Sequence, residues 1–245
     1  MSKQRLDQLV QQQYPQYSRQ QIQSWIMQRK VSVDGIIQDK PGVQVKSEAH
    51  IELSVQEPKF VSRAGFKLEK ALDHFGVDVI GLTVLDAGLS TGGFSDCLLQ
   101  RGAKEIFGVD VGYGQVHEKI RSDARVHVME RTNLRTLTLN TIGKQVDLVT
   151  LDLSFISILK VMDAVNNILK PGGMLITLIK PQFEAEKGQV GKGGIIKNPA
   201  VHQEIITKVP AGIESFGFTC KGVIESPIYG ADGNKEFLAL FIKHA

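Results

Sequence analysis

Apolar residues change their spacing along the first 58 residues. Helical spacing over residues 6–10 and 22–26 predicts two helices, and Ser18 is a suitable N-cap for the second. From Val31 onward the period becomes two, and Asp34-Gly35 is a hairpin turn signal, so short strands should fill the rest. We therefore expect a small α+β domain over residues 1–58, followed by a linker at residues 59–63.

Residues 64–245 alternate apolar strand patterns with helical ones. Helices are predicted at about 64–75, 93–101, 157–169 and 199–216, and strands near 83–87, 105–110, 126–130, 146–152 and 174–180. Such alternation indicates an α/β, Rossmann-like fold with a mostly parallel sheet covered on both faces. Two last strands, near 219–225 and 236–242, resemble a closing hairpin that makes one edge of a seven-stranded sheet antiparallel.

The composition is that of a globular protein, with 42% hydrophobic and 22% charged residues. No apolar run is long enough to cross a membrane, and the start lacks the apolar core of a secretory signal, so we expect a cytoplasmic protein. Cys97 and Cys220 stand apart and indicate neither disulfides nor a thiolate metal site. His117, His127 and His202 lack metal-ligand spacing, so no metal is expected. A net charge of +3 permits a nucleic-acid partner without requiring one.

The stretch VLDAGLSTGGF, residues 84–94, matches two signatures at once. G-x-S-x-G is the nucleophile elbow of hydrolases, which would make Ser90 a nucleophile with His202 or His244 as partner. A hydrolase elbow, however, follows a strand deep within its sheet, whereas this stretch begins the first strand of the domain. The alternative is a glycine loop that binds a cofactor at the carboxyl end of a strand, and we favour it.

The residues around this loop point to S-adenosylmethionine (SAM). Glycines at 88, 92 and 93 let the backbone approach a ligand, and Asp110 follows at about the spacing of an acid that binds ribose hydroxyls. Asp86 lies just before the loop, where a carboxylate would repel a pyrophosphate but attract an ammonium group. SAM carries an ammonium and a sulfonium and no phosphate, so the sequence predicts a methyltransferase.

The next question is which atom accepts the methyl group. The D-L-S-F sequence at 152–155 lacks the prolines typical of DNA amino-methylating enzymes, and neither cysteine fits a carbon-5 nucleophile. Hydroxyl methylation remains, and charged residues should then converge at the site. Four candidates form a K…D…K…E series, with a lysine closing an apolar strand: Lys67, Asp152, Lys180 and Glu236.

This series, together with VLDAGLSTGGF, resembles the FtsJ-like ribose 2′-O-methyltransferases. The chain more closely resembles the TlyA family of rRNA 2′-O-methyltransferases, which are often labelled hemolysins. Ordered motifs carry that resemblance, including FVSRAGFKLEKAL (60–72), GVDVGYGQ (108–115), LDLSFIS (151–157), IKPQFE (179–184) and SPIYGADGNKEFLALF (226–241). Residues 1–58 resemble the αL RNA-binding module named after a small-subunit ribosomal protein, through Arg5-Leu6-Asp7, Ser18-Arg19 and residues 29–35.

The resemblance implies methyl transfer from SAM to rRNA in ribosomal subunits. It makes Lys180 the residue that assists deprotonation, with Asp152 orienting Lys180 and Glu236 positioning Lys67. The residues expected to bind the cofactor are Asp86, Gly88, Ser90, Gly92, Gly93, Phe94 and Asp110, with Glu130 or Asn133 at the adenine. The residues expected to contact RNA are Arg5, Arg19, Arg29, Lys30 and Arg63.

Two other functions are weighed against this one. A membrane-active hemolysin would need an apolar span or a long amphipathic helix, and the sequence contains neither. An RNA-binding assembly protein with an inactive methyltransferase fold would bind SAM without transferring methyl groups, but the complete K-D-K-E series argues against decay. Phe155 and Phe183 follow the site motifs, and we interpret both as core residues rather than as platforms for a base.

Overall fold

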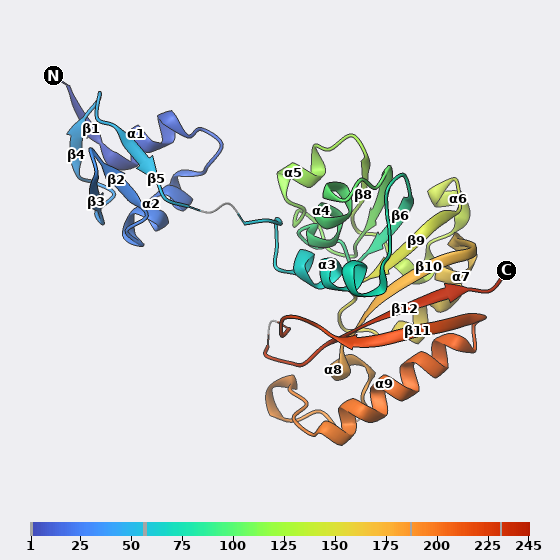
Figure 1. Ribbon diagram of the computed structural model, residues 1–245. Helices are drawn as coiled ribbons and strands as arrows, with labels where there is room; N and C mark the ends of the chain where they lie inside the picture. Colours follow the sequence, from blue (N-terminus) through green and yellow to red (C-terminus); the bar gives the residue numbers. More distant parts are fainter. Residues whose placement is uncertain (1, 56–57, 187, 231) are drawn as a thin grey trace. The chain divides into compact units, whose positions relative to one another are not determined.

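The chain divides into two compact units in the computed structural model, residues 1–58 and residues 59–245 (Figure 1). The structure describes residues 2–55, 58–186, 188–230 and 232–245. We call the two parts the N-terminal unit and the C-terminal unit, and each is described by itself.

The N-terminal unit is a small α+β fold around one apolar cluster that includes Leu6, Ile22 and Ile26. Its elements are β1 (Lys3–Arg5), α1 (Leu6–Gln13), α2 (Arg19–Met27), β2 (Val31–Val33), β3 (Ile36–Gln38), β4 (Gln44–Lys46) and β5 (Ile51–Leu53). Strands pair in the orders β3-β2-β5 and β1-β4, all antiparallel. Ser18 caps α2 as expected, because its hydroxyl and the Gln21 side chain each bond the other's backbone N–H.

The C-terminal unit contains the expected seven-stranded sheet, in the order β11-β12-β10-β9-β6-β7-β8. Its strands are β6 (Thr83–Ala87), β7 (Glu105–Val109), β8 (Val126–Met129), β9 (Val146–Leu151), β10 (Leu169–Ile179), β11 (Phe218–Glu225) and β12 (Phe237–Lys243). Five neighbouring strands, β8, β7, β6, β9 and β10, run parallel to one another. Strand β12 runs antiparallel to both of its neighbours, β10 and β11. The reversed strand therefore lies one place in from the edge, inside the hairpin that the sequence predicts.

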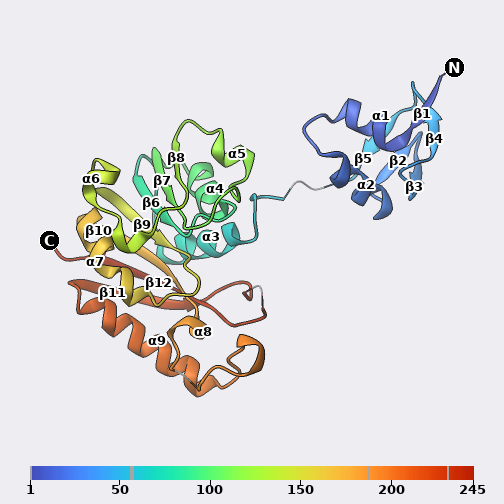
Figure 2. The ribbon, with the colours of Figure 1, turned by 180° about the vertical axis from the view of Figure 1, so that it is seen from behind.

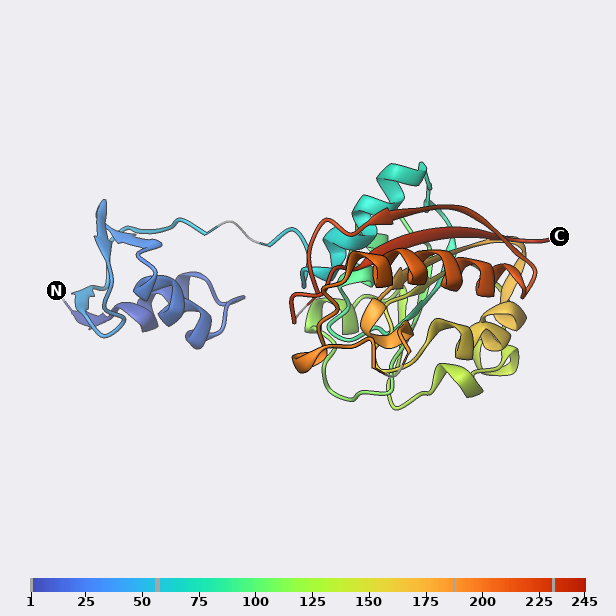
Figure 3. The ribbon, with the colours of Figure 1, turned by 90° about the horizontal axis from the view of Figure 1, so that it is seen from below.

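Helices cover both faces of this sheet (Figures 1 and 2). The α-helices are α3 (Ala64–Phe75), α4 (Gly93–Gln100), α5 (Glu118–Arg121), α6 (Leu139–Ile142), α7 (Met162–Ile168), α8 (Pro181–Glu184) and α9 (Pro199–Glu214). Short 3₁₀ turns are η1 (Leu134–Thr136), η2 (Ile158–Val161) and η3 (Lys192–Gly194). Side chains alternate along each strand, so Val84 belongs to the apolar cluster that includes residues of α3 and α4, whereas Leu85 belongs to the cluster on the other face, which includes residues of α7 and α9. Figure 3 shows α9 running along β11 and β12.

Parallel order brings the carboxyl ends of β6, β7, β8 and β9 to one edge of the sheet. Because β12 is reversed, its amino end reaches the same edge, with Phe237 paired to Ile179 at the end of β10. Open α/β sheets bind ligands at this edge, where loops from several strands meet. The residues that follow or precede these strand ends are therefore the ones to examine for function.

Candidate active site

The glycine loop connects β6 to α4 in a conformation that side chains would block. Gly88 has a φ of +87°, and a Cβ placed there would lie 2.3 Å from the carbonyl oxygen of Asp152. A Cβ on Gly93 would lie 2.2 Å from Ser62 Oγ. Ser90 is held in the left-handed region with a φ of +48°, and its N–H donates to Asp110 Oδ2 at 2.8 Å. The loop thus needs glycine for close backbone contact.

The hydrolase interpretation of Ser90 fails on the position of its candidate partners. His244 bonds Thr219 Oγ1 near the start of β11, away from the carboxyl ends of the parallel strands. His202 lies on α9 and packs against the ring of Phe237. Neither histidine pairs with Ser90, so the nucleophile–base contact that such catalysis needs is missing.

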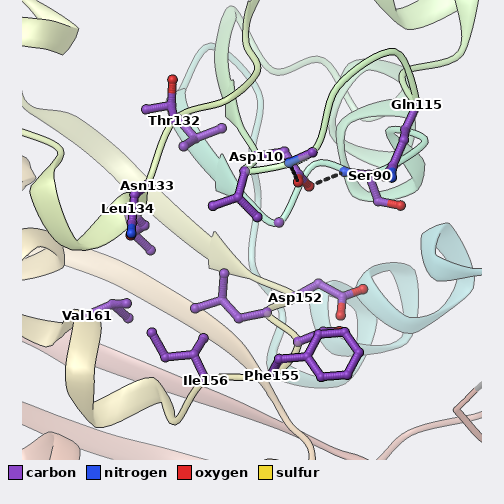
Figure 4. A pocket seen from close by; sticks show the side chains of 16 residues that line it. Ser90, Asp110, Gln115, Thr132, Asn133, Leu134, Asp152, Phe155, Ile156 and Val161 are labelled. Carbon is purple, nitrogen blue, oxygen red and sulfur yellow. Dashed lines mark hydrogen bonds between the residues drawn. The ribbon is translucent and has the colours of Figure 1, made fainter.

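A cavity of about 390 Å³ opens beside the glycine loop, within the range of small-molecule sites (Figure 4). Its wall comes from the loops after four parallel strands and from Val161. The lining includes Gly88 and Ser90 after β6, Asp110 and Gln115 after β7, Thr132, Asn133 and Leu134 after β8, and residues 152–156 after β9. A smaller cavity of about 70 Å³ shares Gly88, Ser90 and Asp152 with it and adds Ser62, Ala64, Gly93 and Phe94.

Asp110 joins the two loops that form one side of the cavity. One carboxylate oxygen accepts from Ser90 N, as Figure 4 shows, and the other accepts from Gly112 N at 2.7 Å. Each carboxylate oxygen can accept a further hydrogen bond. Asp110 is therefore both the support of these loops and an acceptor suited to ligand hydroxyls.

The structure does not bring Asp86 to the cavity, although the sequence interpretation gave it a ligand ammonium. Its carboxylate is fully buried and accepts from Ser95 Oγ at 2.6 Å and Thr150 Oγ1 at 2.8 Å. Burial raises the pKa of Asp86 to about 6, against the lowering effect of these two hydrogen bonds. Asp86 thus ties α4 to β9 underneath the loop and lines neither cavity.

Of the other residues expected to bind the cofactor, Asn133 lines the larger cavity, whereas Glu130 and Gly92 line neither cavity. Asn133 lines the larger cavity, while its Oδ1 accepts from Arg135 N. Glu130 is outside both linings and fastens the loop after β7, accepting from Gly114 N at 2.6 Å and pairing with Arg121 at 3.0 Å. Gly92 is also outside both linings. It lies against Ile120 instead, whose Cγ1 would be 2.8 Å from a Cβ placed on Gly92.

The four charged candidates form two ion pairs. Lys180 Nζ lies 2.6 Å from Asp152 Oδ1 and donates to Ser154 Oγ at 3.0 Å. Lys67 Nζ lies 2.6 Å from Glu236 Oε2, and these two side chains are only 10% and 3% exposed. Gly230 accommodates the second pair, because a Cβ there would lie 2.5 Å from Glu236 Oε1.

The two pairs belong to one region of the sheet edge. Lys180 and Glu236 directly extend the paired residues Ile179 and Phe237 of neighbouring strands. Asp152 lines both cavities, and Ala64, one helical turn before Lys67 on α3, lines the smaller one. The structure therefore gathers two lysines and two carboxylates beside the glycine loop.

The basic residues of the N-terminal unit have unequal surroundings. Arg5 and Arg19 both pair with Asp7, which is fully buried and also accepts from Gln23 Nε2. Burial alone would raise the pKa of this carboxyl, but the hydrogen bonds it accepts hold its pKa far below the ordinary value. Both arginines thus support the fold while 42% and 45% of their side chains stay exposed.

The other three expected RNA contacts lie on the surface. Arg29 and Lys30 line a surface cavity of about 530 Å³ in the N-terminal unit, and Arg29 has the left-handed φ of +61°. Arg29, in this left-handed conformation, therefore makes the turn that leads into β2. Arg63 is exposed at the start of α3.

Three residues near the site were missed or misjudged from the sequence. Phe155 is 90% exposed, with a φ of +64°, so its interpretation as a core residue was wrong. Its ring lies 5.1 Å from that of Phe183. Ser154 belongs to the same loop and Glu184 contacts it; both lie within the motifs LDLSFIS and IKPQFE, but no role was predicted for either. The signal for Phe155 was its place after a strand end beside Asp152.

The part of the chain that the structure describes contains neither a metal-binding cluster nor a membrane-spanning helix. Within these ranges, no group of three or more His, Cys, Asp or Glu side chains is arranged to hold a metal ion. Among the helices so described, none is long and apolar enough to cross a membrane.

Comparison with known proteins gives a consistent result for both units. Residues 60–243 match the FtsJ-like methyltransferase family, and residues 4–51 match the S4 domain. The chain is 44% identical to the putative rRNA methyltransferase YqxC of Bacillus subtilis, over 82% of this chain and 72% of that one. It is 42% identical to the 16S/23S rRNA (cytidine-2′-O)-methyltransferase TlyA of Mycobacterium tuberculosis, over 90% and 82%. Hemolysin A of Brachyspira hyodysenteriae is 41% identical, over 97% and 99%.

Solved structures agree with this result. A putative hemolysin from Streptococcus thermophilus matches with a TM-score of 0.75 and 38% identity, over all of this chain and 90% of that one. A putative hemolysin from Lactococcus lactis matches with a TM-score of 0.74 and 46% identity, over 76% and 90%. A putative SAM-dependent methyltransferase from Listeria monocytogenes, 19% identical with a TM-score of 0.55, shares the fold over 75% of this chain and all of that one.

Proposed function

This chain belongs to the FtsJ-like methyltransferase family and carries an S4 domain, and we propose that it methylates ribose 2′-hydroxyls of ribosomal RNA with SAM as donor. The observation that carries the proposal is the pair of lysine–carboxylate contacts beside the glycine loop. Relatives at 42–44% identity bear rRNA methyltransferase names, which supports the substrate class. A ribosomal substrate would be met in the cytoplasm.

The residues around the cavity fit SAM in kind. The backbone from Gly88 to Phe94 would hold the methionine part, since glycine permits close approach there. Asp110 would accept from the ribose hydroxyls, and Asn133 with the apolar wall would adjoin the adenine. When bound, SAM supplies an electrophilic methyl group on a positively charged sulfur. Asp152, which lines both cavities, would supply a negative charge that suits this positively charged donor.

The ribose hydroxyl must lose its proton as its oxygen attacks the methyl carbon. We assign Lys180 as the group that takes this proton, as an uncharged amine that becomes an ammonium, with Asp152 and Ser154 fixing the direction of its Nζ. Glu236 holds Lys67 at the same edge, so the positive charge of Lys67 stands near the developing oxyanion. Base assistance typically supplies about 10²–10⁴-fold, whereas alignment supplies roughly 7–11 kcal/mol, so positioning by these pairs contributes most.

The S4 domain would bring the RNA to this edge. Arg29, Lys30 and Arg63 are exposed cations, and Arg5 and Arg19 keep part of their guanidinium groups accessible. Contacts from such groups to phosphates set position and affinity rather than sequence. The exposed ring of Phe155, in the loop that lines the cavity, offers a surface on which a base near the target ribose can stack.

The test is methylation of purified small and large ribosomal subunits, taken from a strain lacking the gene, with labelled SAM and mapping of ribose methylation. Lys180→Ala should abolish transfer while the Kd for SAM stays within about threefold, because Lys180 is outside both cavity linings. Lys170→Ala is the matched control, since Lys170 pairs with Asp147 across the same two strands at their other end. Wild-type turnover by Lys180→Ala would refute the assignment.

SAM binding without methyl transfer to either subunit would instead support the assembly-protein alternative. The two intact ion pairs argue against that outcome. A buried ion pair such as Lys67–Glu236 contributes little to stability compared with apolar residues, so an inactive fold would not need it.

A further inference from the structure

The loop between β9 and η2, residues 152–157, forms much of the cavity wall. Its residues 152–156 all line the larger cavity, and Phe155 adopts a left-handed backbone that a large side chain rarely takes. The sheet fixes the beginning of the loop, where Asp152 N donates to Ala87 O at 3.0 Å. A strained loop of this kind persists only if its far end is also held.

A second segment, residues 180–184, holds that loop at three points. Lys180 contacts Asp152 and Ser154, and the ring of Phe183 lies against that of Phe155. The third contact is Glu184, at the end of α8, which reaches the last residues of the loop.

Glu184 uses both of its carboxylate oxygens for this contact. Oε2 accepts from Ser157 Oγ at 2.7 Å, and Oε1 accepts from Ile158 N at 2.8 Å. Ile158 begins η2, which continues into α7, so the carboxylate also occupies the amino end of a helical segment. Burial raises the pKa of Glu184, and the two hydrogen bonds oppose that rise. The group is partly buried and doubly bonded, unlike an ordinary surface glutamate.

We propose that Glu184 is a positioning residue for methyl transfer, which holds the loop at residues 152–157 in a fixed position relative to Lys180. The inference rests on the proposed function. Because Glu184 and Lys180 belong to one short segment, the place of Ser154 and Phe155 relative to Lys180 depends on this contact. Loss of the contact frees the far end of the loop, while the sheet still fixes Asp152.

The expected consequence falls on the chemical step. A misplacement of about 1 Å can cost about 10²-fold in rate, so Glu184→Ala should slow single-turnover methylation of ribosomal subunits at least about tenfold. The Kd for SAM should change by less than about threefold, because the glycine loop and Asp110 keep their own contacts. Affinity for the ribosomal subunit should also change little, since Glu184 contacts none of the basic residues that we expect to bind RNA.

A conservative variant separates positioning from charge. In Glu184→Gln the amide oxygen can still accept from Ile158 N, and the amide NH₂ can donate to Ser157 Oγ, which then acts as acceptor. This variant should keep a rate within about threefold of wild type. Ser157→Ala removes one of the two bonds and should give an intermediate rate. Glu186→Gln is the matched control, because Glu186 is an exposed glutamate that pairs with Lys208 on the surface.

The experiment measures single-turnover rate, SAM Kd by calorimetry, subunit affinity and thermal unfolding for all four variants. The proposal stands if Glu184→Ala loses rate with near-normal affinities and Glu184→Gln restores it. It is overturned if Glu184→Ala transfers methyl at the wild-type rate, or if its loss follows SAM affinity alone. If Glu184→Ala unfolds, a wild-type rate for Ser157→Ala overturns it. If wild type and Glu186→Gln methylate neither subunit, the proposed function itself has failed, which is a distinct result.

Discussion

Asp86 makes folding of the C-terminal unit depend on pH in a direction opposite to that of most carboxylates. Its pKa rises from an ordinary 3.8 to about 6, because burial penalises the charged form more than Ser95 and Thr150 stabilise it. The folded state therefore binds the proton more tightly than the unfolded chain. The stability that this group contributes is complete below about pH 4 and is lost as the pH rises through about 6.

The size of the effect follows from the shift. A change of about two pKa units corresponds to about 3 kcal/mol in the free energy of unfolding. Asp86→Asn cannot ionise, so its stability relative to wild type should improve by about 2.5 kcal/mol between pH 4 and pH 7, the rest of the difference falling below pH 4. Any fixed cost of altering the hydrogen bonds to Ser95 and Thr150 is the same at both pH values and cancels.

Urea unfolding at a series of pH values measures this difference. Far-UV circular dichroism follows both units, while Trp25, the single tryptophan, reports on the N-terminal unit and serves as an internal control. Ser95→Ala removes one hydrogen bond to the carboxylate and should extend the window above pH 6. Parallel pH profiles for wild type and Asp86→Asn, or a shift to lower pH in Ser95→Ala, would refute the reasoning.

Three further predictions follow from the contacts of the site. Gly88→Ala should abolish SAM binding in calorimetry, because its Cβ would lie 2.3 Å from a carbonyl oxygen of Asp152 at a φ that alanine rarely adopts. Glu236→Ala should lower the free energy of unfolding by about 3–5 kcal/mol, since it leaves Lys67 buried without a partner; adding Lys67→Met should recover much of that loss in urea titrations. Removal of residues 1–58 should weaken RNA affinity far more than SAM affinity, and equal losses in both titrations would contradict the assigned division of labour.

Local patterns predicted most of the elements. The helix expected at 64–75 is α3 to the residue, because its apolar spacing and the left-handed Gly76 after it define both ends. Strands that depend on pairing between residues distant in the sequence could not be predicted as well. β1 exists through its pairing with β4, and β10 begins at Leu169 instead of 174 because Leu169 pairs with Val146 across a bulge. Such contacts depend on tertiary structure rather than on local spacing.

The site was predictable in kind and less so in detail. Motif order indicated the K-D-K-E residues, whereas the direction of each side chain could not be read from adjacency to a loop. Asp86 precedes the glycine loop, but its buried carboxylate points away from it, because hydroxyls on α4 and β9, those of Ser95 and Thr150, donate hydrogen bonds to it. Arg5 was expected to contact RNA because residues 1–58 resemble an RNA-binding module, and the structure pairs its guanidinium with Asp7. Glu184 lies within the motif IKPQFE, but its role could not be predicted because its partners, Ser157 and Ile158, lie in another segment.

The place of β12 in the sheet has a consequence for biosynthesis. Translation delivers Lys67, Asp152 and Lys180 well before Glu236, and β12 must then enter between β10 and β11. Until that strand docks, a nascent chain has a lysine near its core without a counter-ion and a sheet with a missing member. The last strand of the sheet to be synthesised therefore follows directly on Glu236, the counter-ion of Lys67, so the two ion pairs can both form only when translation is almost finished.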